Sequence, residues 1–399
     1  MFARTRVEPI GFRIRWRRVW TAIRQPLVRR LAGSATELHQ ATHPSPLDLH
    51  TAMQAVLVSE PRAVPTLQEV PDPTPPPHGA VVEVHATGVC RSDWHAWVGH
   101  DPTVAFPHVP GHEFAGVVAA VGSEVRRFRG GERVTAPFCC GCGGCDPCRS
   151  GLQNLCEREY QPGFDGWGSF ARYVVVPWAD VNLVDLPEHL PFDVAASLGC
   201  RFVTAFRGLV DQVRVEAGET VVVFGCGGVG LAAVMVAAAV GARVVAVDIH
   251  DTKLALAREL GAHEELNAHQ ADPLEGVREL TGGGAHVSVD ALGSRDTFQQ
   301  GIRSLRPRGR HLQLGLLLAH DADPPAPMHE VIRRELTVMG SHGMQARRYP
   351  DLFRFIRSRD LPLSRLIGER RPLTEAGSVL ASMEDFGPVG ATILEPDRT

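Results

Sequence analysis

The pattern of hydrophobic and polar positions changes near residue 200. Before that point, short β-branched runs bounded by glycine or proline are typical of antiparallel strands in a partly open β-rich domain; they are Val81–His85, Val117–Val121 and Tyr173–Val176. Between about residues 220 and 315, apolar strand-like runs alternate with helical segments, which indicates βαβ units on a parallel sheet. After about residue 340 the chain returns to short mixed elements. The pattern predicts a β-rich domain made from both ends of the chain, with a doubly wound α/β domain inserted.

The α/β region contains the longest apolar stretch of the chain, Gly227–Val247, which Arg243 and several glycines interrupt. These interruptions make it a poor membrane span, and a strand, turn, helix and second strand fit it better. The strands expected in this region are Val221–Phe224, Val244–Asp248, Val287–Ala291 and His311–Gly315, and the helices are Leu231–Val240 and Lys253–Leu260.

Composition limits the classes of protein to which the chain can belong. Its 399 residues suffice for two or three domains, and a hydrophobic fraction of 44% is not that of a disordered chain. A formal net charge of −4 provides no reason to expect nucleic acid or an anionic membrane as a partner. Nine cysteines are too few for a disulfide scaffold, and six of them fall between Cys139 and Cys156, which favours metal binding. Because no segment has the pattern of a secretory signal, we expect a cytoplasmic protein.

The first 52 residues differ from the rest of the chain. They contain nine arginines and three acidic residues, a charge of about +6, which leaves about −10 for the remainder. Such an Arg-rich, acid-poor start resembles a transit peptide, and Arg13–Arg30 could form a basic amphipathic helix on a membrane surface. We favour a disordered tail, or a start codon assigned too early, because Met53 begins a strand-like MQAVLV.

A glycine-rich motif follows the first strand of the α/β region. Val221–Val223 leads into Gly225-Cys226-Gly227-Gly228-Val229-Gly230 and then an apolar helix, which is the context of a dinucleotide-binding turn. Its glycines let backbone N–H groups approach a pyrophosphate, and the helix N-terminus favours the negative charge. The second strand ends about 20 residues on in Asp248, whose carboxylate can accept hydrogen bonds from ribose hydroxyls and would repel a 2′-phosphate. The motif therefore predicts NAD rather than NADP as the cofactor.

A cluster of cysteines indicates a structural metal site. The spacing C-x2-C-x2-C-x7-C suits a tetrahedral zinc on one short lobe, with the ligands Cys142, Cys145, Cys148 and Cys156. This choice of four ligands is not unique, because Cys139, Cys142, Cys145 and Cys148 are also evenly spaced by three residues. In that register Cys156 would not be a ligand. A disulfide cluster is the alternative, which the missing signal peptide disfavours.

A second possible metal site is dispersed along the chain. Each of its pieces is weak evidence alone, because a single buried cysteine or histidine is usually structural. Together they offer the thiolate and imidazole ligands of a catalytic zinc with one coordination position open. The pieces are Gly88-Val-Cys90-Arg-Ser-Asp-Trp-His95, Gly111-His112-Glu113 and Leu198-Gly-Cys200.

In order and spacing, these motifs resemble those of the zinc-dependent alcohol dehydrogenases of the medium-chain dehydrogenase/reductase (MDR) family, over about Met53 to Leu394. The resemblance implies a GroES-like catalytic domain with an inserted Rossmann domain. We expect a basic extension over residues 1–52, a catalytic domain over 53–202 and 340–399 with a structural zinc lobe at 139–156, and a Rossmann NAD-binding domain over 203–339. A homo-oligomer, either dimer or tetramer, is also implied, with the strand region around Glu335–Gly343 at its interface.

The resemblance also implies a role for each residue of the two metal motifs. Cys90, His112 and Cys200 are expected to bind the catalytic zinc, with Glu113 nearby and Asp93 orienting His112. The family register assigns the structural zinc to Cys142, Cys145, Cys148 and Cys156, so that two zinc ions per chain are expected. Cys139 and Cys140 are left without a role.

Further roles concern the proton, the cofactor and the substrate. The resemblance implies that Ser92 receives the alcohol proton and that His95 passes it to solvent, for which a pKa near the reference value of about 6.5 would be suitable. The remaining residues are expected at the cofactor pyrophosphate (Arg91), beside the adenosine ribose (Lys253) and in the substrate pocket (Trp97 and Phe138). Relatives often carry a basic residue where this chain has Gly390-Ala391-Thr392, which leaves one phosphate contact in doubt.

The activity that the resemblance implies is reversible, NAD-linked oxidation of a small alcohol to an aldehyde or ketone. A polyol or sugar dehydrogenase is the alternative within the family, although such enzymes often have glutamate in place of the third zinc cysteine, here Cys200. A zinc-free quinone reductase of the same fold would lack Cys90, His112 and the four-cysteine lobe. A nucleotide-sensing or structural protein without turnover is the non-enzymatic alternative; it should show damage at Ser92, His95 or a zinc ligand, and none is visible.

Overall fold

The computed structural model describes residues 52–384 and 389–396. The expectations for the segment before Ala52, a disordered tail, a transit peptide or a basic helix, fall outside the described residues. Residues His50–Thr399 form one compact unit. Within the described ranges, no helix combines the length and the apolar character that crossing a membrane requires.

The α/β region is built on a six-stranded sheet in which every pair of neighbouring strands is parallel. In spatial order the strands are β10 (Glu264–Asn267), β9 (Arg243–Asp248), β8 (Thr220–Phe224), β11 (Ala285–Asp290), β12 (Leu305–Gln313) and β13 (Thr337–Gly340). The strand order reverses between β8 and β11. In open α/β sheets, ligands bind in the crevice beyond the carboxyl ends of the strands at such a reversal.

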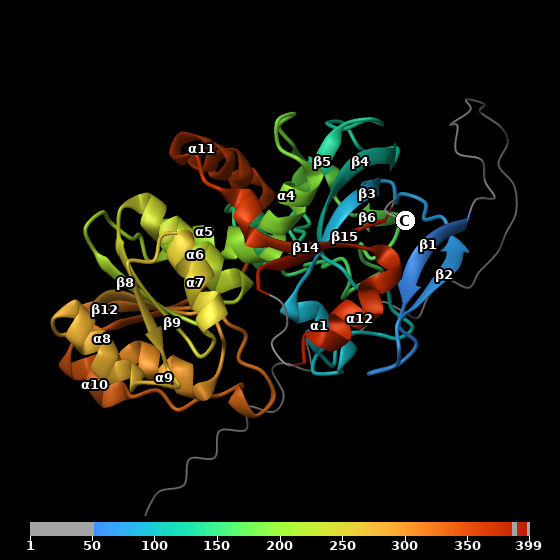
Figure 1. Ribbon diagram of the computed structural model, residues 1–399. Helices are drawn as coiled ribbons and strands as arrows, with labels where there is room; N and C mark the ends of the chain where they lie inside the picture. The colour runs from blue at the N-terminus through green and yellow to red at the C-terminus, as the bar shows by residue number, and fades with distance from the viewer. Residues whose placement is uncertain (1–51, 385–388, 397–399) are drawn as a thin grey trace, which may run out of the picture. The chain divides into compact units, whose positions relative to one another are not determined.

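Helices cover both faces of this sheet, as Figure 1 shows. One face packs against α6 (Gly228–Val240) and α7 (Asp251–Glu259), and the other against α8 (Pro273–Thr281) and α9 (Arg295–Arg303), while α10 (Met328–Arg333) precedes the edge strand β13. The alternation along β8 explains why both faces need cover. Val221 and Val223 join the core on the α6 side, whereas Val222 and Phe224 join the core on the α8 side. A strand buried on both faces is apolar throughout, as the sequence of β8 is.

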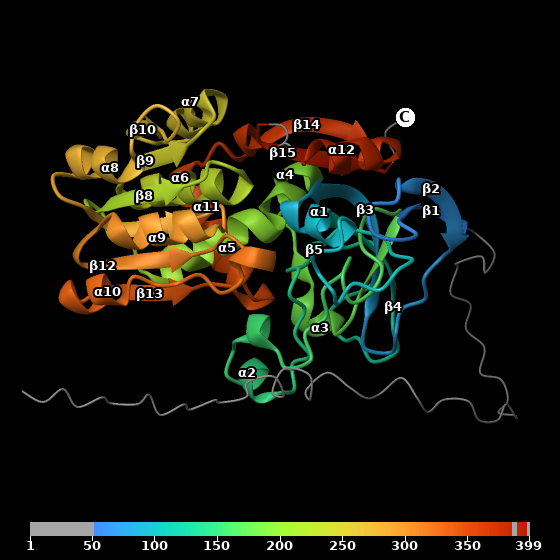
Figure 2. The same ribbon diagram turned by 90° about the horizontal axis from the view of Figure 1, so that it is seen from below.

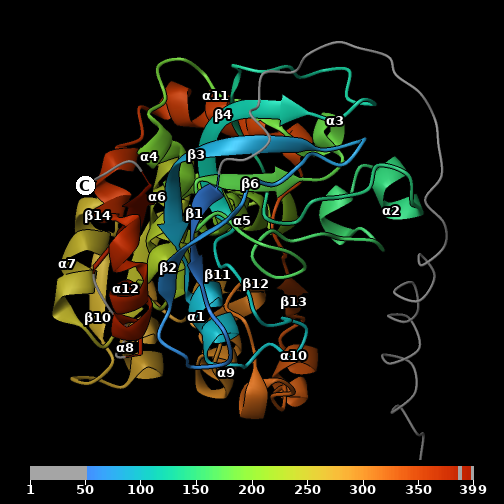
Figure 3. The same ribbon diagram turned by 90° about the vertical axis from the view of Figure 1, so that its right-hand side faces the viewer.

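The β-rich domain contains a mostly antiparallel sheet in which both ends of the described chain meet. Its strands run in the order β14 (Ile367–Pro372), β15 (Ala391–Glu395), β3 (Ala80–Val89), β4 (Glu113–Val121), β5 (Arg133–Thr135) and β7 (Val184–Asp185), with β6 (Tyr173–Val176) also paired to β3. The C-terminal strand β15 lies against β3, with Thr392 opposite Val89. A separate hairpin of β1 (Ala52–Leu57) and β2 (Thr66–Pro71) lies beside it (Figure 3).

Short helices connect and flank these strands. They include α1 (Arg91–Trp97), α2 (Asp146–Arg149), α3 (Ala179–Asn182), α11 (Tyr349–Arg359) and α12 (Ala376–Ser382). Figure 2 shows α2 in a lobe set apart from both sheets. A continuous helical run joins the two domains and packs on α6; it consists of α4 (Phe192–Ser197), the π-helical turn η2 (Leu198–Phe202), α5 (Val203–Phe206) and a second π-helical turn η3 (Arg207–Gln212). π-Helical turns are frequent at functional sites.

The expected fold class is confirmed: a parallel, doubly wound sheet is inserted in a β-rich domain. Several elements were not expected, and β10 is an example. Its sequence, Glu-Glu-Leu-Asn, has no apolar run, because β10 is an edge strand whose residues are only half-buried. Pairing with β9 makes it a strand, and a local pattern cannot report that pairing.

Candidate active site

The dispersed metal motif comes together at the junction of the two domains. Cys90 follows β3, His112 precedes β4, and Cys200 lies in η2. One potential ligand atom from each of Cys90, His112, Glu113 and Cys200 lies within 4.8 Å of the corresponding atom in every other member of the group. Three segments far apart in the chain thus supply the thiol and imidazole ligands of one tetrahedral site.

Asp93 holds this site together through three hydrogen bonds. Its Oδ2 accepts from the backbone N–H of Cys90 at 2.8 Å, which also caps the start of α1. Its Oδ1 accepts from the backbone N–H of Gly111 at 3.1 Å and from Nδ1–H of His112 at 2.9 Å. Because Nδ1 carries the proton in that arrangement, Nε2 of His112 is left as an acceptor.

The donor set fits a zinc ion. Nε2 of His112 is buried without a hydrogen-bond partner among the described residues, which is costly unless a ligand is bound there. A hydrogen bond from the Cys200 thiol lowers the pKa of Cys90 well below its usual value, and His112 acts in the same direction. These contributions outweigh burial, which alone would raise the pKa. Of Cys90 and Cys200, Cys90 is therefore the thiolate. Cys90, His112 and Cys200 are therefore the residues that could hold the metal.

Glu113 is turned toward an arginine that the sequence had not singled out as a site residue. Its Oε1 accepts from Nε of Arg201 at 3.1 Å, and its Oε2 accepts from Nη2 of the same guanidinium. The backbone N–H of Cys200 also donates to Oε1, at 3.1 Å. Burial raises the pKa of Glu113 to about 7, although Arg201 opposes the rise. Arg201 directly follows a metal ligand, which was the one signal that could have identified it.

A second group of four sulfurs lies in the lobe that contains α2. The sulfurs of Cys142, Cys145, Cys148 and Cys156 lie within 4.8 Å of one another. Backbone N–H groups of Cys142 and Arg158 donate to Sγ of Cys156, each at 3.2 Å, as expected for sulfurs that carry negative charge. The set is that of a closed structural zinc site.

The two unassigned cysteines lie elsewhere. Cys139 and Cys140 are fully buried, and Sγ of Cys139 lies 3.7 Å from the carbonyl oxygen of Met344. Burial raises the pKa of Cys139 to about 12 and also raises that of Cys140, so neither thiol ionises at neutral pH. The structure thus groups the four sulfurs in the register that includes Cys156 and separates Cys139 from them.

A cavity of about 650 Å³ extends from the dispersed metal cluster to the glycine-rich turn. Cys90 and Arg201 line one end of it, and the turn Gly225–Val229 and Asp248 line the other. A Cβ atom on Gly230 would lie 1.7 Å from the carbonyl oxygen of Gly225, so the turn requires glycine there. At Gly227 a Cβ would meet nothing within 4 Å, which leaves open space at the N-terminus of α6 where a pyrophosphate can approach.

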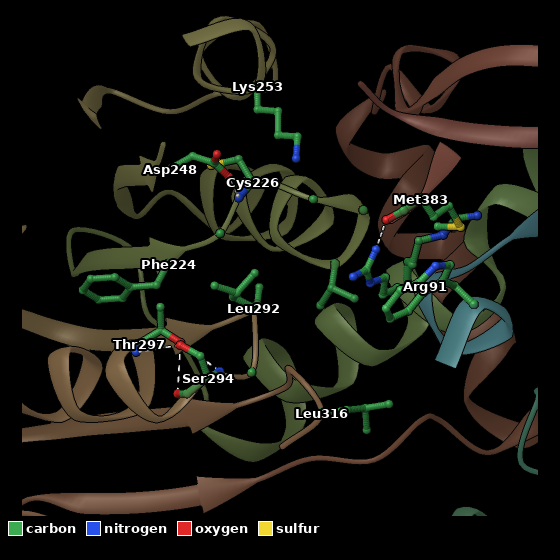
Figure 4. Close-up of a pocket in the computed structure, with 18 of the residues that line it drawn as sticks. Arg91, Phe224, Cys226, Asp248, Lys253, Leu292, Ser294, Thr297, Leu316 and Met383 are labelled. Carbon is green, nitrogen blue, oxygen red and sulfur yellow. Dashed lines mark hydrogen bonds between the residues drawn. The ribbon is translucent and has the colours of Figure 1, made fainter. Parts of the chain in front are cut away.

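Asp248 lies at the end of β9 on the side of the cavity formed by the glycine-rich turn. Its Oδ2 accepts from the backbone N–H of Cys226 at 2.7 Å, and Oδ1 accepts from the N–H groups of Ile249 and His250 at 2.8 and 3.0 Å. Figure 4 shows Lys253 extending from α7 above Asp248 and Cys226. Lys253 also lines the cavity and is largely buried. The arrangement can hold an adenosine ribose.

The proton-relay candidates lie beside the metal cluster. Ser92 is close to Cys90, whose Sγ lies 3.8 Å from its Oγ. His95 lines the cavity, and its Nδ1 lies 3.0 Å from Nδ1 of His100. Burial and the charge of Arg91 lower the pKa of His95 to about 4. The pKa near 6.5 that we expected for His95 is therefore wrong for this structure, because the ring is too buried to gain a proton at neutral pH.

Arg91 directly follows Cys90 of the metal cluster and lines the same cavity. Its guanidinium carbon lies 3.7 Å from the ring centroid of Trp94, and Nη1 donates to the carbonyl oxygen of Met383. Figure 4 shows this contact between Arg91 and Met383 at the edge of the cavity. Arg91 and the glycine-rich turn therefore face the same space.

Two family models match the chain. The alcohol dehydrogenase GroES-like domain matches residues 76–188, and the zinc-binding dehydrogenase domain matches residues 228–358. An alcohol dehydrogenase of Rhizobium meliloti (strain 1021) is 38% identical over 298 residues, which cover 72% of this chain and 84% of that protein. The chain belongs to the zinc-dependent alcohol dehydrogenase family of the MDR enzymes. It is therefore a zinc-type oxidoreductase by family.

Other relatives of this dehydrogenase differ in substrate and cofactor. A sorbitol dehydrogenase of Halalkalibacterium halodurans is 34% identical over 287 residues, which cover 70% of this chain and 80% of that protein. The crystal structure of a putative zinc-binding dehydrogenase from Sinorhizobium meliloti 1021 bound to NADP has a TM-score of 0.77 and 29% identity, and the match covers 87% of this chain and all of that one. Family membership alone therefore decides neither the alcohol nor the form of the nicotinamide cofactor.

The two residues expected in the substrate pocket of this dehydrogenase lie in different surroundings. Trp97 packs in the core between α1, α12 and the β1–β2 hairpin, and its Nε1–H donates to the carbonyl oxygen of Ala63 at 2.8 Å. It is outside the residues that line the large cavity, which Trp94 of the same helix does line. Phe138 lies beside the metal cluster, with its ring 6.0 Å from that of His112 and 5.2 Å from that of His342.

Proposed function

We propose that this dehydrogenase catalyses the reversible, NAD-linked oxidation of a small alcohol to an aldehyde or ketone. One observation carries the proposal: a single cavity is lined both by Cys90, a member of the Cys90–His112–Cys200 cluster, and by the glycine-rich turn with Asp248. A metal-held substrate oxygen and a dinucleotide can thus occupy the same space, as hydride transfer requires.

The preference for NAD rests on Asp248. Its carboxylate accepts three backbone hydrogen bonds, which hold it in place. A fixed negative charge at the adenosine ribose accepts hydrogen bonds from the 2′ and 3′ hydroxyls and repels a 2′-phosphate. Lys253 adds a positive charge nearby, so the proposal depends on Asp248 outweighing it.

When bound, zinc supplies a Lewis acid for the substrate oxygen, and the nicotinamide supplies the hydride acceptor. The chain's own residues do the rest. Asp93 fixes the tautomer and orientation of His112. Ser92 lies next to Cys90 and accepts the alcohol proton. His95 lines the same cavity and is neutral at pH 7 because of its lowered pKa, so it would relay the proton without keeping it, one ring nitrogen accepting a proton as the other releases one.

A polyol or sugar is the second candidate substrate class, because a sorbitol dehydrogenase is among the relatives. The third cysteine of the cluster, Cys200, favours the simple alcohol.

The test is a steady-state survey of the purified, zinc-loaded protein. NAD and NADP are each supplied with primary, secondary, aromatic and polyol substrates, and zinc per chain is measured on the same sample. Turnover of simple alcohols with NAD and about two zinc ions per chain are the expected results. Faster turnover of polyols selects the second candidate. No turnover with any substrate, despite two zinc ions, would overturn the enzymatic proposal in favour of a nucleotide-binding protein without catalysis.

A further inference from the structure

Arg201 connects the metal cluster to the cofactor turn. Its side chain is 9% exposed and forms an ion pair with the fully buried Glu113 through Nε and Nη2. The same side chain reaches the start of α6, where a Cβ added to Gly228 would lie 2.3 Å from Cδ of Arg201. A single guanidinium therefore lies between a carboxylate beside the metal ligands and the first residue of the helix that follows the glycine-rich turn.

Two glycines make room for this arrangement. At Gly88 a Cβ would lie 2.3 Å from Oε2 of Glu113 and 2.7 Å from Nη2 of Arg201. At Gly199 a Cβ would lie 2.6 Å from Cβ of Glu113. β3 and η2 thus close around the ion pair, and the side chain of Arg201 also lines the large cavity.

The ion pair leaves part of the guanidinium unused. An arginine has five N–H donors, and Glu113 engages Nε and Nη2. Among the residues that the structure describes, Nη1 makes no hydrogen bond with a side chain or the backbone. Nη1 is not among the buried polar atoms without a partner, so it retains some exposure and stays accessible to a ligand. The acceptor that fits a guanidinium at the positive end of a helix is a phosphate oxygen.

We propose that Arg201 serves both sites: one edge of its guanidinium binds and orients Glu113 beside the metal ligands, and the other binds the cofactor phosphate on the nicotinamide side. This inference rests on the proposed function, because it assumes that a dinucleotide occupies the cavity. Its consequence is a coupling between the two sites. The negative charge of the Glu113 carboxylate weakens the attraction between Arg201 and the phosphate. A bound phosphate in turn weakens the attraction between Arg201 and Glu113, because both bind the same guanidinium.

Opposite effects of two substitutions test the proposal. Binding of NADH, ADP-ribose and AMP is measured by fluorescence and competition on the zinc-loaded protein. Arg201→Gln should weaken NADH and ADP-ribose by about tenfold or more, the range for a hydrogen bond to a charged group, and should leave AMP within about twofold. Glu113→Gln keeps Arg201 and removes the competing charge, so it should bind ADP-ribose at least as tightly as the unmodified protein.

Two further variants control for damage to the fold. Arg201→Gln leaves the buried Glu113 without its ion-pair partner, which can unfold the protein. The double variant Arg201→Met with Glu113→Gln replaces the pair by neutral groups and should lose ADP-ribose affinity to the same extent. Arg207 is a matched control: it is equally buried in the same helical run, bonds to Ser341 and lies outside the cavity lining. Arg207→Gln should leave ADP-ribose binding unchanged.

The outcomes separate the inference from the function on which it rests. If the unmodified protein binds no NADH, the proposed function fails. If it binds NADH and the Arg201 variants bind ADP-ribose equally well, Arg201 is structural and the inference is wrong. An equal loss of AMP and ADP-ribose affinity would likewise overturn it, because the effect would then not be confined to the second phosphate.

Discussion

Nδ1 of His112 lies 2.9 Å from Oδ1 of Asp93, and neither side chain is exposed. Asp93 also accepts from the backbone of Cys90, so one carboxylate orients two metal ligands that come from different strands. The metal site is therefore organised by a residue that does not bind the metal.

Replacing Asp93 by Asn should weaken the catalytic zinc by about 10- to 100-fold, because the imidazole loses the charged acceptor that orients it. The measurement is zinc per chain after dialysis against graded chelator, where one of two ions should be lost early. Asp180→Asn serves as control, because the carboxylate of Asp180 lies in the same domain and accepts hydrogen bonds from the backbone N–H groups of Arg126 and Arg127. Equal zinc retention in both variants would contradict the role of Asp93.

Ser92→Ala should lower kcat while the zinc content stays the same, since the variant loses a proton acceptor beside Cys90 and no metal ligand. A loss of about 100-fold is the lower end of what a positioned proton-transfer group contributes. The matched control is Ser294→Ala on the cofactor side of the same cavity, which should act on KM for NAD rather than on kcat. Unchanged turnover in the Ser92 variant would remove Ser92 from the relay.

Cys156→Ala and Cys139→Ala should differ in zinc content. The first variant removes one of four grouped sulfurs and should reduce zinc by about one ion per chain, with a fall in Tm because a structural zinc contributes to folding. The second removes a buried thiol outside that group and should keep both ions. Loss of zinc from the Cys139 variant instead would support the other cysteine register.

Asp248→Asn should shift the preference between cofactors. The amide oxygen can still accept backbone hydrogen bonds, but the charge that repels a 2′-phosphate is gone, so kcat/KM for NADP relative to NAD should rise about tenfold, which corresponds to roughly 1.4 kcal/mol. Asp251→Asn, an exposed neighbour at the start of α7, is the control. A wild-type protein that already prefers NADP would show that the assignment of Asp248 is wrong.

His108 should make the protein less stable in mild acid. Burial lowers its pKa to about 4, so the native state binds fewer protons than the unfolded chain below the reference value of about 6.5. The free energy of unfolding is therefore highest above pH 6.5. As the pH falls toward 4, protonation of His108 in the unfolded chain lowers it by at most about 3 kcal/mol. The check is the free energy of unfolding of His108→Leu across this range.

Because Nε2 of His108 has no hydrogen-bond partner among the described residues, leucine at this position should lose little at pH 7. The His108→Leu variant should show a smaller drop in stability between pH 7 and pH 4.5 than the unmodified protein. His189→Leu, at an exposed position, is the comparison. Identical pH slopes in the His108 variant and the unmodified protein would contradict the prediction.

Several predictions from the resemblance remain to be tested. The expected homo-oligomer stays a prediction, although β13, within the segment Glu335–Gly343 that we placed at its interface, is an edge strand of the parallel sheet with Val338 41% exposed. Its N–H and C=O groups on the open side could pair with another strand.

The sequence by itself determined the fold class and the two metal motifs. Strand β8, the glycine-rich turn and Asp248 follow one another closely in the chain, and the four lobe cysteines lie within 15 residues. The spacing of residues within one short segment is therefore enough to predict both sites. Steric demands explain this: the turn requires glycine at Gly230 whatever surrounds it, and close sulfur ligands need only a short loop to meet.

The tertiary structure alone decided what depends on segments far apart in the chain. Arg201 pairs with Glu113, which lies 88 residues away in the chain, and the pKa of His95 falls because other elements bury its ring. Trp94 and Trp97 of α1 lie in the same core, but only Trp94 also lines the cavity. Burial, and the desolvation of charge that comes with it, is a property of the packed chain, and no local pattern of residues contains it.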